Sequence, residues 1–214
     1  MSTTIALLGQ PNAGKSTVFN ALTGLRQHVG NWPGKTVEKK EGSFTRNGKD
    51  YEVADLPGSY SLTANSDEEV ITRDFISSGK ADVVCILADS SQLERSLFMT
   101  ADYAGINVPS FLVLNMADVA ADQGKKIDAK AIEKKLGIPV VMLSATDSKQ
   151  YEAFFDAMER AVKNKTLIDS SSLEEEFQKI DGYEELKAAI PEGTVDKYSS
   201  MWLAVKALEN DKVV

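Results

Sequence analysis

The chain is poor in cysteine and histidine, with one residue of each among 214. A single cysteine cannot form a disulfide within the chain, which suits a reducing cytosol. One Cys and one His also exclude a metal site built from several such ligands. Cys85 lies in the apolar run of residues 83–87, where a buried thiol that packs as a small hydrophobic side chain is the simplest interpretation.

The sequence also lacks a signal peptide and any run of about 18 apolar residues that could span a bilayer. Positive charge is not in excess: 24 Lys and Arg face 32 Asp and Glu, for a net charge of −8. A nucleic-acid-binding protein should show a basic face. We therefore expect a chain that is itself soluble and no nucleic-acid partner.

Strand-like and helical patterns alternate over residues 1–167. Asn47-Gly48 is a strong hairpin turn, so one strand pair should be antiparallel and the rest of the sheet parallel. The pattern predicts a doubly wound α/β fold with a six-stranded, mostly parallel sheet containing one antiparallel strand. The expected strands are 4–8, 36–46, 49–55, 83–89, 110–115 and 140–143, and the expected helices are 16–23, 67–78, 92–104, 129–136 and 151–163.

From residue 168 the strand-like runs stop and helical patterns follow to the end. We expect residues 168–214 to form a small all-helical domain. Ser172 and Glu175 have the spacing of a capping box for its first helix. The sequence Pro191-Glu-Gly193 should separate two further helices, over 183–190 and 199–208.

A phosphate-binding loop is predicted between the first strand and the first helix. Residues 9–16 fit G-x-x-x-x-G-K-[ST], preceded by an apolar run and followed by a helical pattern. The glycines allow backbone N–H groups to turn toward a phosphate, and the helix dipole favours the same place. Lys15 would reach the β- and γ-phosphates, and the Ser16 hydroxyl would hold Mg²⁺. The alternative, a glycine-rich turn with a surface lysine, is disfavoured by this context.

Three further elements follow in the order of a guanine-nucleotide site, each at the end of an expected strand. Asp55-Leu56-Pro57-Gly58 fits D-x-x-G, in which the aspartate acts near Mg²⁺ and the glycine N–H senses the γ-phosphate. Asn115-Met116-Ala117-Asp118 fits N-x-x-D. A carboxylate only accepts hydrogen bonds, and guanine offers two adjacent donors that adenine lacks. Ser144-Ala145-Thr146 resembles the S-A-x element that closes over the base. Together the motifs predict binding of GTP and GDP.

These motifs, with residues 29–42 between them, resemble the cytosolic GTPase domain of the FeoB family of bacterial ferrous-iron transporters. The segments that carry the resemblance are 9–17, 29–42, 55–62 and 114–119, and it extends over nearly the whole chain. It implies a GTP-hydrolysing regulatory domain, with a slow intrinsic rate, at the cytoplasmic face of the bacterial inner membrane. It also implies a membrane-embedded region of the same protein as partner, and it permits a homo-oligomer.

The resemblance assigns residues 27–36 to the first switch loop, with Thr36 joining Ser16 and Asp55 around Mg²⁺. Asn12 occupies the position that offers an oxygen to K⁺ in potassium-activated relatives. Catalysis is expected from Lys15, Asn12, Thr36 and Gly58. The residues expected to contact nucleotide are Gly9, Gln10, Pro11, Asn12, Ala13, Gly14, Lys15, Ser16, Thr17, Gly34, Lys35, Thr36, Asp55, Leu56, Pro57, Gly58, Asn115, Met116, Asp118, Ser144, Ala145 and Thr146.

Some positions differ from small signalling GTPases. Ser59 stands where those proteins have a glutamine that orients the attacking water, so backbone groups of the switch loops should position it here. Met116 replaces the lysine that packs on the base, which predicts weaker base binding and fast exchange. His28 is interpreted as an exposed loop residue and Trp32 as a mobile surface aromatic.

Two other functions remain open on sequence grounds. A ribosome-assembly GTPase would share the motifs, although such proteins usually add a basic RNA-binding domain. A nucleotide switch with negligible turnover is compatible with the missing glutamine. Since metal ligands are sparse, tight binding of Fe²⁺ is not expected. The first switch loop is predicted to couple GTP turnover to a distant gate through the helical tail.

Overall fold

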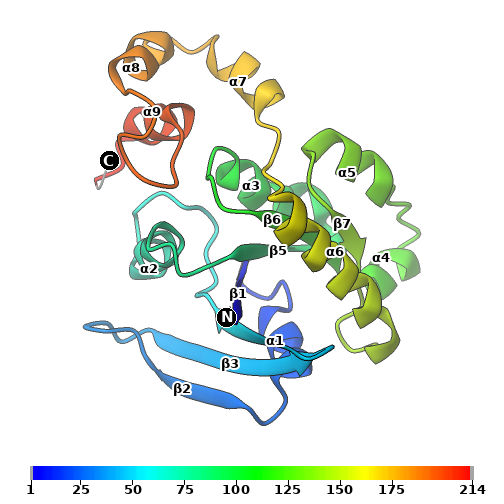
Figure 1. Ribbon diagram of the computed structural model, residues 1–214. Coiled ribbons are helices and arrows are strands. Elements are labelled where there is room, and N and C mark those ends of the chain that lie inside the picture. The colour runs from blue at the N-terminus through cyan, green and yellow to red at the C-terminus, as the bar shows by residue number, and fades with distance from the viewer. Residues whose placement is uncertain (1, 213–214) are drawn as a thin grey trace.

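The computed structural model describes residues 2–212. Within these residues, seven strands form one sheet in the order β2-β3-β4-β1-β5-β6-β7; Figure 1 shows this sheet among the helices. Of these strands only β3 runs in the opposite direction, since it pairs antiparallel with both β2 and β4. The strands are β1 Thr3–Gly9, β2 Gln27–Asn31, β3 Glu38–Arg46, β4 Lys49–Asp55, β5 Val83–Asp89, β6 Ser110–Asn115 and β7 Val140–Met142.

Helices cover both faces of the sheet, as predicted for a doubly wound α/β fold. They are α1 Lys15–Thr23, α2 Asp67–Ser77, α3 Leu93–Tyr103, α4 Ala117–Asp122, α5 Ala129–Leu136, α6 Tyr151–Asn164, α7 Ser171–Phe177, α8 Tyr183–Ala189 and α9 Ser200–Leu208, with 3-10 turns at Ser90–Gln92 and Ser148–Gln150. The hairpin prediction is confirmed, because Asn47 and Gly48 both have positive φ, 51° and 73°. The sheet differs from the prediction by one added strand, β2.

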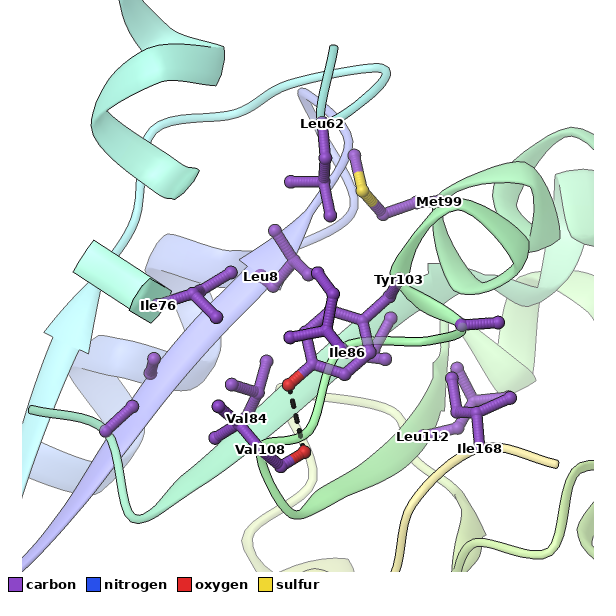
Figure 2. Packing of buried hydrophobic residues seen from close by; sticks show 14 of the residues in the cluster. Leu8, Leu62, Ile76, Val84, Ile86, Met99, Tyr103, Val108, Leu112 and Ile168 are labelled. Carbon is purple, nitrogen blue, oxygen red and sulfur yellow. Dashed lines mark hydrogen bonds between the residues drawn. The ribbon is translucent and has the colours of Figure 1, made fainter. Parts of the chain in front are cut away.

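Strand alternation sends side chains to two separate cores. Ala6 and Leu8 of β1 face the core that includes residues of α2 and α3, whereas Ile5 and Leu7 face the core formed with α1 and α6. Figure 2 shows the first core, in which the Tyr103 hydroxyl donates to the carbonyl oxygen of Val108 at 3.1 Å. Cys85 is fully buried, as expected, and burial raises the pKa of its thiol.

The helical tail contains the helices expected from the sequence, and α9 packs against the sheet-covering helices α2 and α3. Trp202 and Leu203 of α9 belong to the first core. The Trp202 indole N–H donates to the carbonyl oxygen of Asp102 at 2.8 Å, and the Tyr198 hydroxyl donates to that of Arg73 at 3.1 Å. The proposed domain boundary at 167/168 lies between α6 and α7.

The capping role predicted for Ser172 is wrong. The residue before α7 is Ser170, and its side chain makes no capping hydrogen bond. Ser172 lies inside the helix, where its hydroxyl accepts from Lys135 Nζ at 2.6 Å. The Ser172 side chain, which the sequence pattern predicted to cap the helix, therefore joins α7 to α5 instead.

Candidate functional site

The carboxyl ends of the parallel strands lie at one edge of the sheet, and the loop after β1 crosses this edge. Asn12 and Gly14 have left-handed φ angles of 65° and 89°, which turn the loop sharply before α1 begins at Lys15. A Cβ atom on Gly9 would lie 2.7 Å from the carbonyl oxygen of Leu87. The first turn of α1 contains no acidic residue, so its positive dipole end is available to an anion.

Lys15 is folded back over this loop and is 8% exposed. Its Nζ donates to the carbonyl oxygens of Gly9 at 3.1 Å and Gln10 at 3.4 Å. Burial lowers the pKa of Lys15, and the nearby Asp55 carboxylate opposes that shift. A partly desolvated ammonium group next to converging N–H groups is suited to binding phosphate oxygens.

Asp55, at the end of β4, faces the same loop. Ser16 Oγ donates to Asp55 Oδ2 at 3.2 Å, while Asp55 Oδ1 is buried without a hydrogen-bond partner among residues 2–212. Burial raises the pKa of Asp55, and Lys15 and Ser16 act in the opposite direction. A carboxylate and a hydroxyl, with one carboxylate oxygen still unsatisfied, fit a hard divalent cation such as Mg²⁺.

The D-x-x-G segment lies against the phosphate loop. The Leu56 N–H donates to the Leu7 carbonyl oxygen at 3.1 Å, which continues the strand direction past β4. A Cβ atom on Gly58 would lie 3.1 Å from Pro11 Cα and 3.2 Å from Lys15 Nζ. A larger residue here would therefore require the Pro11 backbone and Lys15 Nζ to move by a few tenths of an ångström.

Asn115 joins the phosphate loop to the loop after β7. Its side chain is 2% exposed; Nδ2 donates to the Ala13 carbonyl oxygen at 2.9 Å, and Oδ1 accepts from the Ala145 N–H at 3.0 Å. The next residue, Met116, adopts φ 56° and starts α4. This bend places Asp118 in the first turn of α4.

Asp118 and Ser144 bind each other reciprocally. Ser144 Oγ donates to Asp118 Oδ1 at 3.0 Å and accepts from the Asp118 N–H at 3.2 Å. The hydrogen bond from the Ser144 hydroxyl is the largest cause that lowers the pKa of the exposed Asp118 carboxyl, and a backbone hydrogen bond from Val119 lowers it further. The group is thus held ionised, as a pure acceptor, where a base with two donors could reach it.

Gln150 and Tyr151, which the sequence motifs do not include, stabilise the 144–146 loop. Gln150 Oε1 accepts from the Ser144 N–H at 2.7 Å, and the Tyr151 hydroxyl donates to the Ala145 carbonyl oxygen at 2.9 Å. Both residues follow the S-A-x motif by only a few positions, and this short separation is the sequence feature that could have indicated their contact with the loop.

The expected first switch loop forms a hairpin that packs against α2. Trp32 packs edge-on against Phe75, with ring centroids 5.7 Å apart, and Lys35 Nζ lies 2.6 Å from Asp67 Oδ1. The interpretation of Trp32 as a mobile surface aromatic is wrong, because its ring is half-buried against the first core. His28 is exposed, as expected, but on β2 rather than in a loop.

The structure thus brings together four of the five predicted segments. Residues 9–17, 55–58, 115–118 and 144–146 line the carboxyl edge of the sheet, with Thr17 and Thr146 exposed there. Gly34, Lys35 and Thr36 lie apart in the hairpin loop. Thr36 is exposed and makes no hydrogen bond to Ser16 or Asp55 within the described part of the chain.

Residues 2–212 lack two further features. None of the helices there has the length and apolar character needed to cross a bilayer. No group of three or more His, Cys, Asp or Glu side chains in that range is arranged to hold a metal ion.

Comparison with known proteins identifies the family. The sequence model of the family "Ferrous iron transport protein B" matches residues 3–158. The chain is 37% identical to the Fe(2+) transporter FeoB of Shigella flexneri over 97% of its own length and 27% of that protein. It is 45% identical to the Salmonella typhimurium LT2 protein of the same name over 73% of its length and 21% of that protein. The chain thus spans about a quarter of the relatives that it matches.

Solved structures agree. The cytosolic domain of the T. maritima FeoB iron transporter in GMPPNP form superposes with a TM-score of 0.87 at 34% identity, covering 98% of this chain and 82% of that one. The cytosolic domain of L. pneumophila FeoB gives 0.83 at 31% identity, covering 99% and 91%. These matches confirm the predicted P-loop GTPase fold and the resemblance to FeoB. The chain belongs to the FeoB family of ferrous-iron transport proteins and carries its G domain.

Proposed function

We propose that this domain binds GTP with Mg²⁺, hydrolyses it to GDP and phosphate, and regulates ferrous-iron transport by a longer protein at the cytoplasmic face of the bacterial inner membrane. The observation that carries the proposal is the buried Asn115 side chain, which ties the phosphate loop to the 144–146 loop and so aligns Lys15 with Asp118. The related T. maritima cytosolic domain has been solved in both GMPPNP and GDP forms, which supports a guanine-nucleotide ligand.

The chemistry is the attack of water on the γ-phosphorus, with cleavage of its bond to the β–γ bridging oxygen, so that GDP leaves and phosphate forms. Lys15 and the N–H groups of the phosphate loop stabilise the negative charge that shifts toward the leaving oxygen. Because Ser59 replaces the usual glutamine, backbone groups near Gly58 and Thr36 orient the water. Catalysis is then mainly positioning and electrostatic stabilisation.

Two cations complete the proposed site. Ser16, Asp55 and, after movement of its loop, Thr36 would hold Mg²⁺, which neutralises charge on the β- and γ-phosphates. Asn12, exposed on the phosphate loop, would offer its amide oxygen to K⁺. The carboxylate and hydroxyl oxygens present here are ligands that Mg²⁺ prefers.

Lys206 of α9 connects the helical tail to the segment that follows Gly58. Its side chain is 1% exposed and forms an ion pair with Asp102 of α3. Lys206 Nζ also donates to Thr63 Oγ1 and Glu209 Oε2, each at 2.9 Å. A buried ammonium group with several partners is expensive to displace, so movement of residues 62–64 is transmitted to α9.

A second buried ion pair reinforces this connection. Arg73 of α2 lies 2.5 Å from Asp211 Oδ2, and the same oxygen accepts from the Ala64 N–H at 2.8 Å. The direct link from the nucleotide site to the tail therefore uses residues 62–64, in addition to the first switch loop that the sequence suggested. We infer that the tail conveys this movement toward the membrane-embedded region of the protein.

The direct test is release of inorganic phosphate from GTP by the purified domain, measured with Mg²⁺ in single- and multiple-turnover conditions. Steady production of GDP and phosphate supports the proposal. Tight nucleotide binding without phosphate release would instead favour a switch with negligible turnover, and absence of binding would reject both.

Asp118→Asn should change base preference. The substitution removes an acceptor for guanine's two donors, and loss of a charge-assisted pair costs about 1.5–3 kcal/mol, so GTP affinity should fall roughly 10- to 150-fold. The affinity for xanthosine triphosphate should rise, because the extra carbonyl oxygen of xanthine can accept a hydrogen bond from the new amide. Competition binding with GTP, XTP and ATP measures the effect. Asp122→Asn, one turn further along α4 and exposed, is the matched control; equal binding of ATP and GTP by the unaltered domain would contradict the assignment.

Potassium should stimulate hydrolysis, and Asn12→Ala should lose most of that stimulation. The physical reason is that K⁺ beside the transferring phosphate supplies the charge that an arginine finger supplies elsewhere. Rates in KCl, NaCl and choline chloride at equal ionic strength measure it, with Asn107→Ala, an exposed asparagine in another loop, as the control. Rates that do not depend on the cation would show that Asn12 only braces the loop.

A further inference from the structure

A small cavity of about 120 Å³ lies between the phosphate loop, the segment after Gly58 and the first turn of α3. Asn12, Tyr60 and Arg95 are among the residues that line it. None of the nucleotide motifs includes Arg95 or Tyr60. The cavity nevertheless adjoins the residues proposed to surround the transferred phosphate.

The start of α3 is fixed to the phosphate loop. Gln10 Nε2 donates to the carbonyl oxygen of Arg95 at 2.9 Å, and Ser96 Oγ, which is buried, accepts from the Asp89 N–H at 3.1 Å. These bonds anchor the backbone of Arg95 to the ends of β1 and β5. Its side chain therefore projects from a fixed point.

Tyr60 is the exposed side chain of the segment after Gly58, between the buried Ser59 and Leu62. Tyr60 is 52% exposed, and it follows Gly58, whose fit against Pro11 and Lys15 is tight. The Arg95 guanidinium lies over the Tyr60 ring, with Cζ 5.2 Å from the ring centroid. This is the distance range of a cation–π contact.

We propose that Arg95 is a positioning residue for GTP hydrolysis: its guanidinium holds the Tyr60 ring against α3 and thereby keeps Gly58 and Ser59 beside the phosphate loop. Because Ser59 replaces the glutamine that would orient water, the backbone of this segment has to be placed by other contacts. Arg95 is one such contact, anchored through Gln10 to the loop that holds the phosphates. The inference rests on the GTPase activity proposed above.

The test is kinetic. Arg95→Ala should lower kcat two- to five-fold, the change that loss of a partly exposed cation–π contact allows. KM for GTP and the dissociation constant of GDP should stay unchanged, since the base site at Asp118 and the Lys15 contacts are intact. A simple loss of folding would lower the melting temperature and nucleotide affinity together, so both are measured. Lys130→Ala, which removes an exposed charge on α5, is the control for net charge.

A double-mutant cycle with Tyr60→Leu identifies the partner. If the two side chains act through each other, the double variant should be no slower than the slower single variant. Additive losses, or an Arg95→Ala variant as fast as the unaltered domain, would overturn the role of Arg95 while leaving the GTPase proposal in place. An unaltered domain that does not hydrolyse GTP would instead overturn the proposed function.

Discussion

Lys15→Ala is expected to reduce GTP hydrolysis by about 10²–10³-fold, the usual effect of removing one preorganised group that stabilises transition-state charge. The reason lies in the geometry: Lys15 Nζ is held by the carbonyl oxygens of Gly9 and Gln10, directly where the phosphates would lie. Single-turnover phosphate release measures the loss. The proposed link to transport predicts that the same change in the longer protein abolishes ferrous-iron uptake in cells that depend on it.

The fold should survive this substitution. Burial lowers the pKa of Lys15, so the folded state disfavours its charged form, and this offsets part of the loss of its hydrogen bonds to the Gly9 and Gln10 carbonyl oxygens. The thermal midpoint of the nucleotide-free variant should therefore lie within a few degrees of that of the unaltered domain. Lys80→Ala, an exposed lysine far from the loop, is the control. Undiminished hydrolysis or iron uptake by Lys15→Ala would refute the proposed role.

Gly14→Ala should disrupt both halves of the site at once. A Cβ atom there would lie 2.1 Å from Asn115 Nδ2, so the Asn115 side chain must leave its positions on Ala13 and Ala145. The residue also has φ 89°, which disfavours alanine by roughly 1–2 kcal/mol. Leaving the Ala13 carbonyl oxygen and the Ala145 N–H without their hydrogen bonds to Asn115 adds a free-energy cost of about 1–3 kcal/mol. Because this cost of about 2–5 kcal/mol falls on the binding-competent arrangement of the site, guanine-nucleotide affinity should fall by at least about 30-fold.

Gly193→Ala separates backbone strain from the clash. Gly193 also has positive φ, 80°, but an added Cβ would meet nothing within 4 Å. It should lower the midpoint of thermal unfolding by only a few degrees and leave GDP binding unchanged, whereas Gly14→Ala should lower both. Titration calorimetry with GDP and thermal denaturation compare the two variants. Equal GDP affinities would show that Asn115 does not link the loops as described.

Much of the sheet could be predicted because β1, β5 and β6 contain apolar runs and the Asn47-Gly48 turn marks the start of β4, and β4, β5 and β6 have the predicted bounds. β2 escaped prediction because its five residues are all exposed and carry no alternating pattern; pairing with β3 defines it. The helix α4 was missed for a similar reason, since it is six residues long and begins after the left-handed Met116.

The site motifs were readable because each is a short local pattern at the end of a strand. The contacts that join the motifs could not be predicted. The side chain of Asn115 bonds to Ala13, which is 102 positions away in the sequence, and to Ala145, which is 30 positions away. The contacts of Trp32 with Phe75 and of Lys206 with Asp102 likewise depend on the fold. A single sequence predicts which side chains a site needs, but long-range packing decides which neighbours hold them.

The edge strand β2 has a thermodynamic consequence. Its backbone is paired on one side only, with β3, and none of its side chains belongs to a core. Detaching it exchanges a few amide hydrogen bonds for bonds to water, at small net free energy, while the apolar interior stays closed. Local opening of this strand is therefore separable from global unfolding. The half of the expected first switch loop that β2 forms can therefore detach and pair again while the rest of the domain stays folded.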